Sequence, residues 1–317
     1  MRHSLHKLMA EVFFQRWGCS SRPADQSEPH EKRPLMYRGS LALVSFLVAT
    51  VVVGLRVEFG SASPVTVLRR FSQKHMAIPA PRLGSVLWSA DMETGDLSQW
   101  SQPDVPGGPN AGGGVFDSGT SISSVDAISV AHSGLHSAKL FINTLNSPGI
   151  STSGVRLFRW LEPQNHSDLY YSVWYYLPQR YIPNGNPPWW NVFQWKSKRG
   201  GTSDPFFSLN VGNRQDGSMY FYLYNQNSKL SYSQSIKNIP DGQWSRVEAF
   251  YKCAGDNGGR VIFWQDGQQI FDIPSVQTRY PDGDCEWSVN SYSSSLNPTS
   301  ATIYVDDAAI CASGRCP

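Results

Sequence analysis

Charge is scarce in this 317-residue chain, since Asp, Glu, Lys and Arg together make up 16% of its residues. That share, beside 13% aromatic side chains and many Gly and Pro, argues against a helical bundle or a long coiled coil. A strong charge of one sign is missing as well. The formal net charge is +2, but from Ser63 onward 19 basic side chains stand against 20 acidic ones. Such a neutral region lacks the basic field that nucleic-acid binding requires, so no nucleic acid is expected as a partner.

Cysteine is also scarce, and no CxxC motif or cluster of His and Cys has the spacing of a zinc site. Cys19 stands alone near the start, and the other four cysteines follow the apolar run described below. An even number in an exported domain suggests disulfides, and four cysteines allow three pairings. We favour Cys253–Cys285, joining neighbouring strands, and Cys311–Cys316, closing a small loop. Free buried thiols are the less favoured alternative.

The N-terminal part has a composition of its own. Residues 1–38 are polar without a period and predict a disordered tail, whereas residues 39–55 form an uncharged apolar run at the short limit for a membrane span. One interpretation is a signal anchor. The other, which we favour, is a cleaved signal peptide beginning at Met36 with small residues before Ser63, which would make residues 1–35 an over-long gene start. Both predict a secreted or cell-surface protein, in contact with the membrane only through this segment if it stays uncleaved.

Residues 56–84 are interpreted as a linker and residues 85–317 as one all-β domain. The clearest pattern lies in 243–274, where three strands follow one another and Asp266-Gly267 marks a hairpin between the last two. Strands are expected at 125–131, 137–142, 154–160, 169–177, 190–197, 205–211, 217–224, 244–252, 260–266, 269–273, 286–291 and 301–310, with a loop at 103–120. A dozen strands without an amphipathic helix predict a two-sheet antiparallel β-jelly roll.

Polar side chains interrupt the apolar alternation of the middle strands. On 190–197 one face is expected to hold Val192, Gln194 and Lys196, and the other Asn191, Phe193 and Trp195. Neighbouring strands add a tyrosine stripe, amides and arginines: Tyr220, Tyr222, Tyr224, Asn210, Asn213, Arg214, Arg156 and Arg159. This set suits a groove that binds the hydroxyls and carboxylates of an acidic polysaccharide while aromatic rings stack on the sugars. Taken singly, each residue also fits ordinary cross-strand packing.

These residue types are the ones that β-elimination at a uronic acid requires. A cation or amide neutralises the C6 carboxylate and makes the C5 proton acidic. A lysine or tyrosinate removes that proton, and a phenol protonates the leaving glycosidic oxygen.

The span from Val86 to Ile310 resembles the heparin-lyase-I-like and related polysaccharide lyases, which have a concanavalin-A-like jelly roll. The resemblance rests on DMETGDLSQW, FQWK, YFYLYNQ, the GQWSRVEAFYK–VIFWQDGQQIF block and IYVDDAAI. It implies that Arg159 and Gln194 bind the uronate carboxylate and that Tyr224 is the acid and base. The chain departs from the pattern at Lys196, which stands where those lyases carry a histidine, so Lys196 as base and a tyrosine-only elimination both remain open.

A second constellation consists of Asp91, Glu93 and Asp306, with Asp307 beside them. The first and last strands of a jelly roll are often neighbours, so these carboxylates could meet, and oxygen ligands on a turn suit Ca²⁺. The resemblance implies a structural calcium ion there. The alternative is that the aspartates are edge charges that discourage aggregation.

The sequence therefore predicts an exported jelly roll that cleaves an acidic polysaccharide. Gln194, Lys196 and Tyr224 are its candidate catalytic residues, and the candidate substrate-binding residues are Arg156, Arg159, Asn210, Arg214 and Tyr222. The alternative is a carbohydrate-binding or adhesion domain without catalysis.

Overall fold

The computed structural model describes residues 83–101, 112–126, 130–145, 149–161 and 166–317. The tail, the apolar segment and nearly all of the linker predicted for residues 1–84 lie outside these ranges. Within them, no helix has both the length and the apolar character needed to cross a bilayer.

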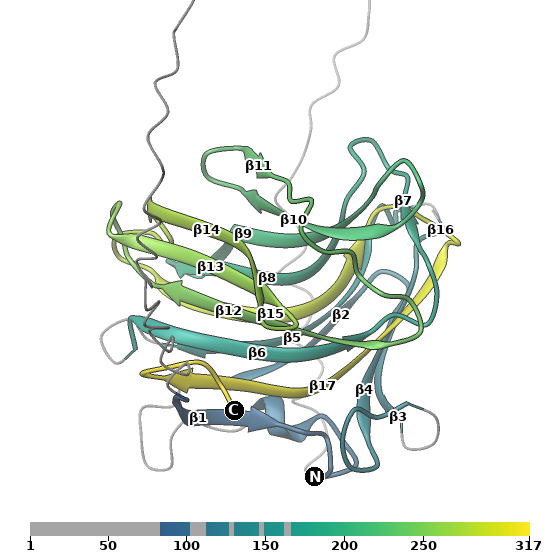
Figure 1. Cartoon of the computed structure of the whole chain (residues 1–317), viewed down its shortest axis with the longest axis horizontal. Coiled ribbons are helices and arrows are strands. Elements are labelled where there is room, and N and C mark those ends of the chain that lie inside the picture. Colours follow the sequence, from purple (N-terminus) through teal and green to yellow (C-terminus); the bar gives the residue numbers. More distant parts are fainter. Residues whose placement is uncertain (1–82, 102–111, 127–129, 146–148, 162–165) are drawn as a thin grey trace, which may run out of the picture. The chain divides into compact units, whose positions relative to one another are not determined.

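The described residues form two large antiparallel sheets and a small pair of strands, packed as two layers (Figure 1). The eight-stranded sheet runs β14-β13-β12-β6-β17-β4-β3, with β1 paired to β17, and the seven-stranded sheet runs β11-β10-β9-β8-β15-β5-β2. The bounds are β1 Ser85–Ala90, β2 Gly113–Ser118, β3 Ser121–Asp126, β4 Ser137–Asn143, β5 Ser153–Leu161, β6 Asp168–Tyr176, β7 Ile182–Pro183, β8 Trp190–Arg199, β9 Thr202–Asn213, β10 Met219–Asn225, β11 Leu230–Tyr232, β12 Trp244–Lys252, β13 Gly259–Gln265, β14 Gln268–Val276, β15 Asp284–Ser293, β16 Leu296–Asn297 and β17 Ser300–Ala312, with one 3-10 turn at Ser98–Ser101. The predicted all-β sandwich is confirmed.

The β12–β13–β14 meander confirms the pattern recognised in 243–274. The chain turns between β13 and β14 at Asp266-Gly267, and both residues have positive φ, +47° and +81°, as the tight hairpin turn of this dipeptide requires. Val247, Ala249 and Tyr251 alternate into the core, where at most 1% of each is exposed. The prediction of a loop across 103–120 is wrong at its end, because β2 pairs there with β5.

Aromatic rings fill the space between the sheets. Trp100 packs against Trp88 with ring centroids 4.7 Å apart and against Trp287 at 5.7 Å. Further along, Trp195 of the seven-stranded sheet stacks on Tyr251 of the eight-stranded sheet at 4.1 Å. Each such buried ring contributes about 2–3 kcal/mol from its apolar surface, so this layer fixes how the sheets sit on each other.

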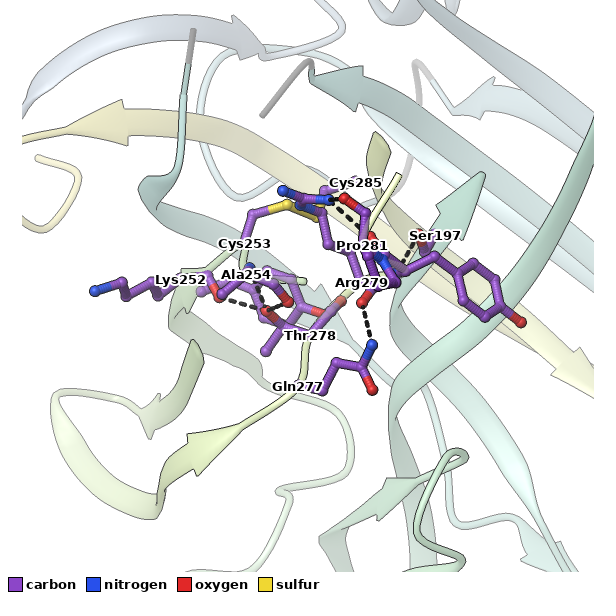
Figure 2. Close-up of a disulfide and its surroundings, with 11 residues drawn as sticks. Ser197, Lys252, Cys253, Ala254, Gln277, Thr278, Arg279, Pro281 and Cys285 are labelled. Atoms are coloured by element: carbon purple, nitrogen blue, oxygen red, sulfur yellow. Dashed lines mark hydrogen bonds between the residues drawn. A yellow bond between two sulfur atoms is a disulfide. The ribbon is translucent and has the colours of Figure 1, made fainter. Parts of the chain in front are cut away.

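Both predicted disulfides are present. Cys253 follows β12 of one sheet and Cys285 belongs to β15 of the other, so this bond joins the two layers and not neighbouring strands as expected. Figure 2 shows how the chain after β14 is held beside it: Thr278 accepts a hydrogen bond from the Ala254 amide and donates to the carbonyl of Lys252. The bond anchors the start of β15, which lies between β8 and β5 inside the seven-stranded sheet.

Candidate active site

A groove of about 970 Å³ lies on the outer face of the seven-stranded sheet. Four of the predicted site residues, Gln194, Asn210, Tyr222 and Tyr224, line it. The lining also includes Ile182, Pro183, Pro187, Pro188, Trp189, Asn191, Pro205, Ser208, Val211, Gly212, Asn213, Tyr220, Gln226, Ser231, Ser233 and Tyr292. All of these side chains are uncharged, so the floor of the groove presents amides, hydroxyls and rings.

Gln194 and Tyr224 face the groove from the same row of the sheet. Ser208 of β9 is the register partner of Tyr224 on one side and of Gln194 on the other. Because neighbouring strands lie about 4.8 Å apart, the backbones of Gln194 and Tyr224 are about 10 Å apart. The Gln194 amide nitrogen donates to the Ser208 hydroxyl at 2.9 Å, which fixes its side chain toward the middle of the row.

A β-bulge corrects one expectation in this region. Asn191 was expected to share a face with Phe193 and Trp195, but the pairing with β9 slips between Asn191 and Phe193. The extra residue turns Asn191 to the groove side, beside Asn210, its register partner. Its amide donates to the carbonyls of Phe193 and Leu209, at 3.2 and 3.3 Å.

The tyrosine stripe of β10 lies on the groove face as predicted, while Phe221 and Leu223 face the core. The Tyr222 hydroxyl donates to the carbonyl of Pro188 at 3.4 Å, across the groove from its own strand. Burial, with Tyr220 and Tyr224 nearby, raises the pKa of Tyr222 to about 12, so this phenol keeps its proton at neutral pH.

One wall of the groove is formed by Trp189 and Tyr292, which were not among the predicted site residues. Trp189 and Tyr292 pack with ring centroids 5.1 Å apart, and the Arg156 guanidinium lies 5.7 Å from the Tyr292 ring. Gly154 makes room for that ring, since a Cβ there would lie 2.1 Å from it. The doubled tryptophan in PPWWN was the available signal for Trp189; Tyr292 lay just past the predicted end of its strand.

Lys196 lies on the groove face of β8 but outside the groove lining, one row beyond Gln194. Its register partners are Pro205, which does line the groove, and Glu286. Burial and the charge of Arg156 lower the pKa of Lys196 to about 8, against the opposing pull of Glu286 and Asp204. A substantial fraction of this lysine is therefore neutral in mildly alkaline solution.

Arg159 is a correction to the predicted site. Its side chain has no exposed surface and points into the core, where it donates to the carbonyl of Trp100 at 2.5 Å and lies 5.0 Å from the Trp88 ring. Residues three apart on a strand face opposite sides, so Arg159 cannot share the face of Arg156. In this structure it is out of reach of a ligand in the groove.

Arg214 lies beyond the other end of the groove. It lines a second hollow of about 560 Å³, which shares Asn213, Tyr220 and Ser233 with the groove. Its guanidinium is 4.5 Å from the Tyr220 ring and donates to the Asn238 side-chain oxygen at 2.7 Å.

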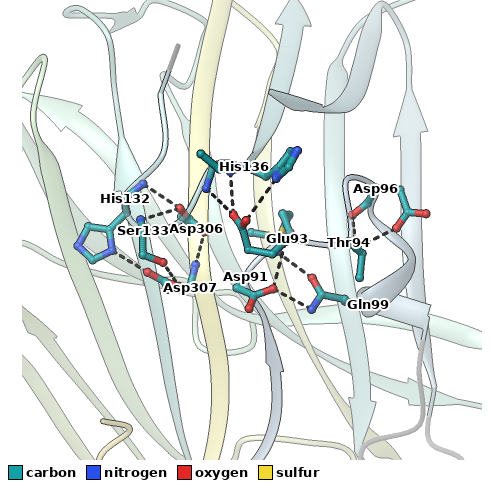
Figure 3. Close-up of polar contacts among 12 residues, drawn as sticks. Asp91, Glu93, Thr94, Asp96, Gln99, His132, Ser133, His136, Asp306 and Asp307 are labelled. Carbon is teal, nitrogen blue, oxygen red and sulfur yellow. Dashed lines mark hydrogen bonds and ion pairs between the residues drawn. The ribbon is translucent and has the colours of Figure 1, made fainter. Parts of the chain in front are cut away.

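Asp91 and Glu93 follow the end of β1, and Asp306 lies in the middle of β17, the strand with which β1 pairs. These carboxylates, which were predicted to bind calcium, accept hydrogen bonds from protein donors (Figure 3). Glu93 accepts the amides of Leu135 and His136, both at 2.8 Å. Asp306 accepts the amide of His132 at 2.8 Å.

Asp91 accepts the side-chain amide of Gln99 at 3.0 Å. In the described part of the chain, no three His, Cys, Asp or Glu side chains are grouped so as to hold a metal ion. The calcium ion stays a prediction.

An antiparallel jelly roll with a groove of amides, tyrosines and a tryptophan on one sheet is an architecture found among carbohydrate-binding proteins. The sequence model of the family described as polysaccharide lyase matches residues 92–309, and the chain belongs to that family. The heparin-lyase-I-like subtype stays a prediction. No curated protein matches the sequence.

Several solved structures are similar to this chain, and the first of those described here shares its fold. The endo-β-1,4-glucuronan lyase of the fungus Trichoderma reesei is 17% identical, with a TM-score of 0.51 over 72% of this chain and 95% of that one. The alginate lyase vAL-1 of a Chlorella virus is 13% identical, with a TM-score of 0.44 over 72% and 99%. The alginate lyase of Aplysia kurodai is 14% identical, with a TM-score of 0.44 over 71% and 98%.

Proposed function

We propose that this protein is a lyase that cleaves a uronic-acid polysaccharide by β-elimination. The observation that carries the proposal is the row in which Tyr224 and Gln194 flank Ser208 across an open groove, in a chain of the polysaccharide lyase family. A pyranose ring above Ser208 contacts both flanking side chains. The fold shared with a glucuronan lyase supports a uronic acid as the unit bound there.

In the proposed reaction, the amide of Gln194 hydrogen-bonds the C6 carboxylate and stabilises the negative charge that develops when the C5 proton leaves. Neutral Lys196 takes that proton, because its lowered pKa makes the free amine accessible and its long side chain spans the single row to Gln194. The C5–H electron pair forms the C4–C5 double bond, and the C4–O bond breaks. Tyr224 gives its phenolic proton to the departing oxygen.

The test is to incubate the full-length chain with glucuronan, alginate, heparin and hyaluronan, and to follow the ultraviolet absorbance of the unsaturated product. We expect one of the four to give product, and Tyr224→Phe to lower kcat by about 10²-fold or more, since it removes the proton donor and little else. Tyr176→Phe, on a strand of the other sheet, is the matched control and should leave the rate unchanged. Retention of a polysaccharide on an affinity gel without product would instead show a carbohydrate-binding domain.

Export is part of the proposal. Its support is the pair of disulfides, which persist in oxidising compartments, together with the apolar run at 39–55. N-terminal sequencing of the native protein distinguishes a cleaved signal peptide, which leaves a new N-terminus near Ser63, from a retained anchor.

A further inference from the structure

A buried carboxylate lies beside the groove, and the elimination as proposed does not use it. Glu286 of β15 is only 4% exposed. Its strand neighbours Cys285 and Trp287 belong to the core, so Glu286 projects from the opposite face, which carries the groove. Its register partner on β8 is Lys196, and its partner on β5 is Trp160.

Packing and hydrogen bonding in the described structure do not explain why a carboxylate lies at Glu286. Its Oε1 is buried and has no hydrogen-bond partner among the described residues. A buried carboxylate left partly unsatisfied is costly, and an apolar side chain would cover Trp160 equally well. An acid at this position is therefore unexplained by packing alone.

The charged groups around Lys196 come from three other strands of the same sheet, and one from its own. Glu286 faces it from β15, Arg156 from β5 and Asp204 from β9, while Lys198 lies on its own strand. Burial raises the pKa of Glu286 to about 7, against the pull of Lys196, Arg156 and Lys198. Above that pH the Glu286 carboxylate is ionised. Its charge raises the pKa of Lys196, whereas burial and Arg156 lower it.

We propose that Glu286 is a positioning residue, whose carboxylate orients the amino group of Lys196 toward the groove and sets the pH at which that lysine releases its proton. The inference rests on the proposed function, because it gives Lys196 the role of base. Glu286 itself touches no reacting atom, and no bond to it forms or breaks.

The pH dependence of kcat/KM tests this inference, because it reports the ionisation of the free enzyme. Glu286→Gln keeps the shape and removes the charge, so Lys196 becomes easier to deprotonate. We expect the rising limb of the profile to move by about one pH unit toward lower pH. At a pH below the limb, this corresponds to a ~10-fold larger fraction of neutral Lys196. Glu286→Asp, which withdraws the carboxylate by one methylene, should give an intermediate limb.

Asp284→Asn is the matched control. Asp284 lies two residues away on the same strand and pairs with Lys198 instead of Lys196, so the limb should stay in place. A second readout needs no substrate: after ¹³C-dimethylation of the lysines, NMR follows the titration of each, and loss of a resonance in Lys196→Arg identifies Lys196. The pH midpoint of the Lys196 titration should be highest in the wild type, lower in Glu286→Asp and lowest in Glu286→Gln. If Glu286→Gln does not fold, the comparison of wild type with Glu286→Asp tests the inference.

The two ideas fail differently. A Lys196→Ala variant with full activity overturns the base role of Lys196 in the proposed reaction. A lysine whose midpoint is the same with and without the Glu286 carboxylate overturns the present inference, even when Lys196→Ala is inactive.

Discussion

Arg156 and Arg159 show how far a single residue's role depends on which face of a strand it occupies. Both lie on β5 and both were expected at the substrate, yet Arg156 lies on the groove face beside Tyr292 while Arg159 lies among core tryptophans. The two-residue period of a strand already separates them, because positions three apart point in opposite directions. Both arginines were nevertheless predicted in the groove, and the resemblance gave Arg159 the uronate carboxylate, which its place in the core contradicts.

Alanine substitutions at the two arginines should therefore have opposite consequences. Arg159→Ala removes a large buried side chain, which leaves a cavity and takes the donor from the Trp100 carbonyl, so we expect the free energy of unfolding to fall by about 3–5 kcal/mol. Its kcat/KM per folded molecule should stay near the wild-type value. Arg156→Ala should lower kcat/KM with a smaller loss of stability. Urea unfolding combined with rates normalised to the folded fraction measures both; an Arg159→Ala protein that is stable but inactive would contradict the assignment to the core.

At the scale of strands, prediction succeeded where a two-residue period ended in turn residues. The range 244–252 was predicted as it is found in β12, and the Asp266-Gly267 hairpin was recognised from the dipeptide itself. It failed where the period was interrupted or weak. β2 was hidden among glycines, and the bulge at Asn191 depends on the partner strand, which the sequence of β8 alone does not reveal.

Site residues, like strands, were predicted where a local pattern marks them and missed where their role depends on neighbouring strands. Gln194 and Tyr224 were predicted because polar residues interrupt apolar strands there, and the structure places both on one row of the groove. Glu286 was missed because β15 is polar on one face throughout, so its side chain did not stand out, and Tyr292 was missed because it lies past the predicted end of that strand. Their significance comes from long-range neighbours, Lys196 and Trp189, that only the register of the sheet brings together.

The two disulfides act on elements of different kinds, and their removal should differ accordingly. Cys253–Cys285 closes a loop with a sequence separation of 32 and joins the sheets, whereas Cys311–Cys316 has a separation of 5 at the end of β17. Loop-closure entropy predicts about 3.7 kcal/mol for the first and about 2 kcal/mol for the second. Paired Cys→Ala variants, compared by urea unfolding, should lose stability in that order. The reverse order would mean that the C-terminal loop contributes far more than its length, for example through the Arg315–Glu248 ion pair.

At the scale of the whole molecule, charge is arranged around the groove and not within it. The described lining is neutral, Lys196 lies at its edge in the row of Pro205, and Arg214 lies past Tyr220 in the other direction. The chain as a whole has little net charge, so a long-range field cannot draw a polyanion in. A polysaccharide must then be held by local contacts. Its carboxylates contact cationic side chains only where the polysaccharide extends to the edges of the groove.

This arrangement predicts that Arg214 matters for long substrates more than for short ones. Tyr224 and Tyr220 are four residues apart on β10, about 13 Å, and Arg214 lies beyond Tyr220, so only a chain of several sugar units reaches it from the cleaved bond. Arg214→Ala removes one charge-assisted hydrogen bond to a carboxylate, about 1.5–3 kcal/mol, and should lower kcat/KM on the polymer by ~10-fold or more. On the shortest oligosaccharide that is cleaved, the variant and the wild type should have equal kcat/KM.

Arg180→Ala is the control, because Arg180 is an exposed arginine paired with Asp241 in the same part of the molecule, and it should change neither rate. An equal loss on short and long substrates would place Arg214 at the cleaved unit and contradict a binding role at the far end of the groove.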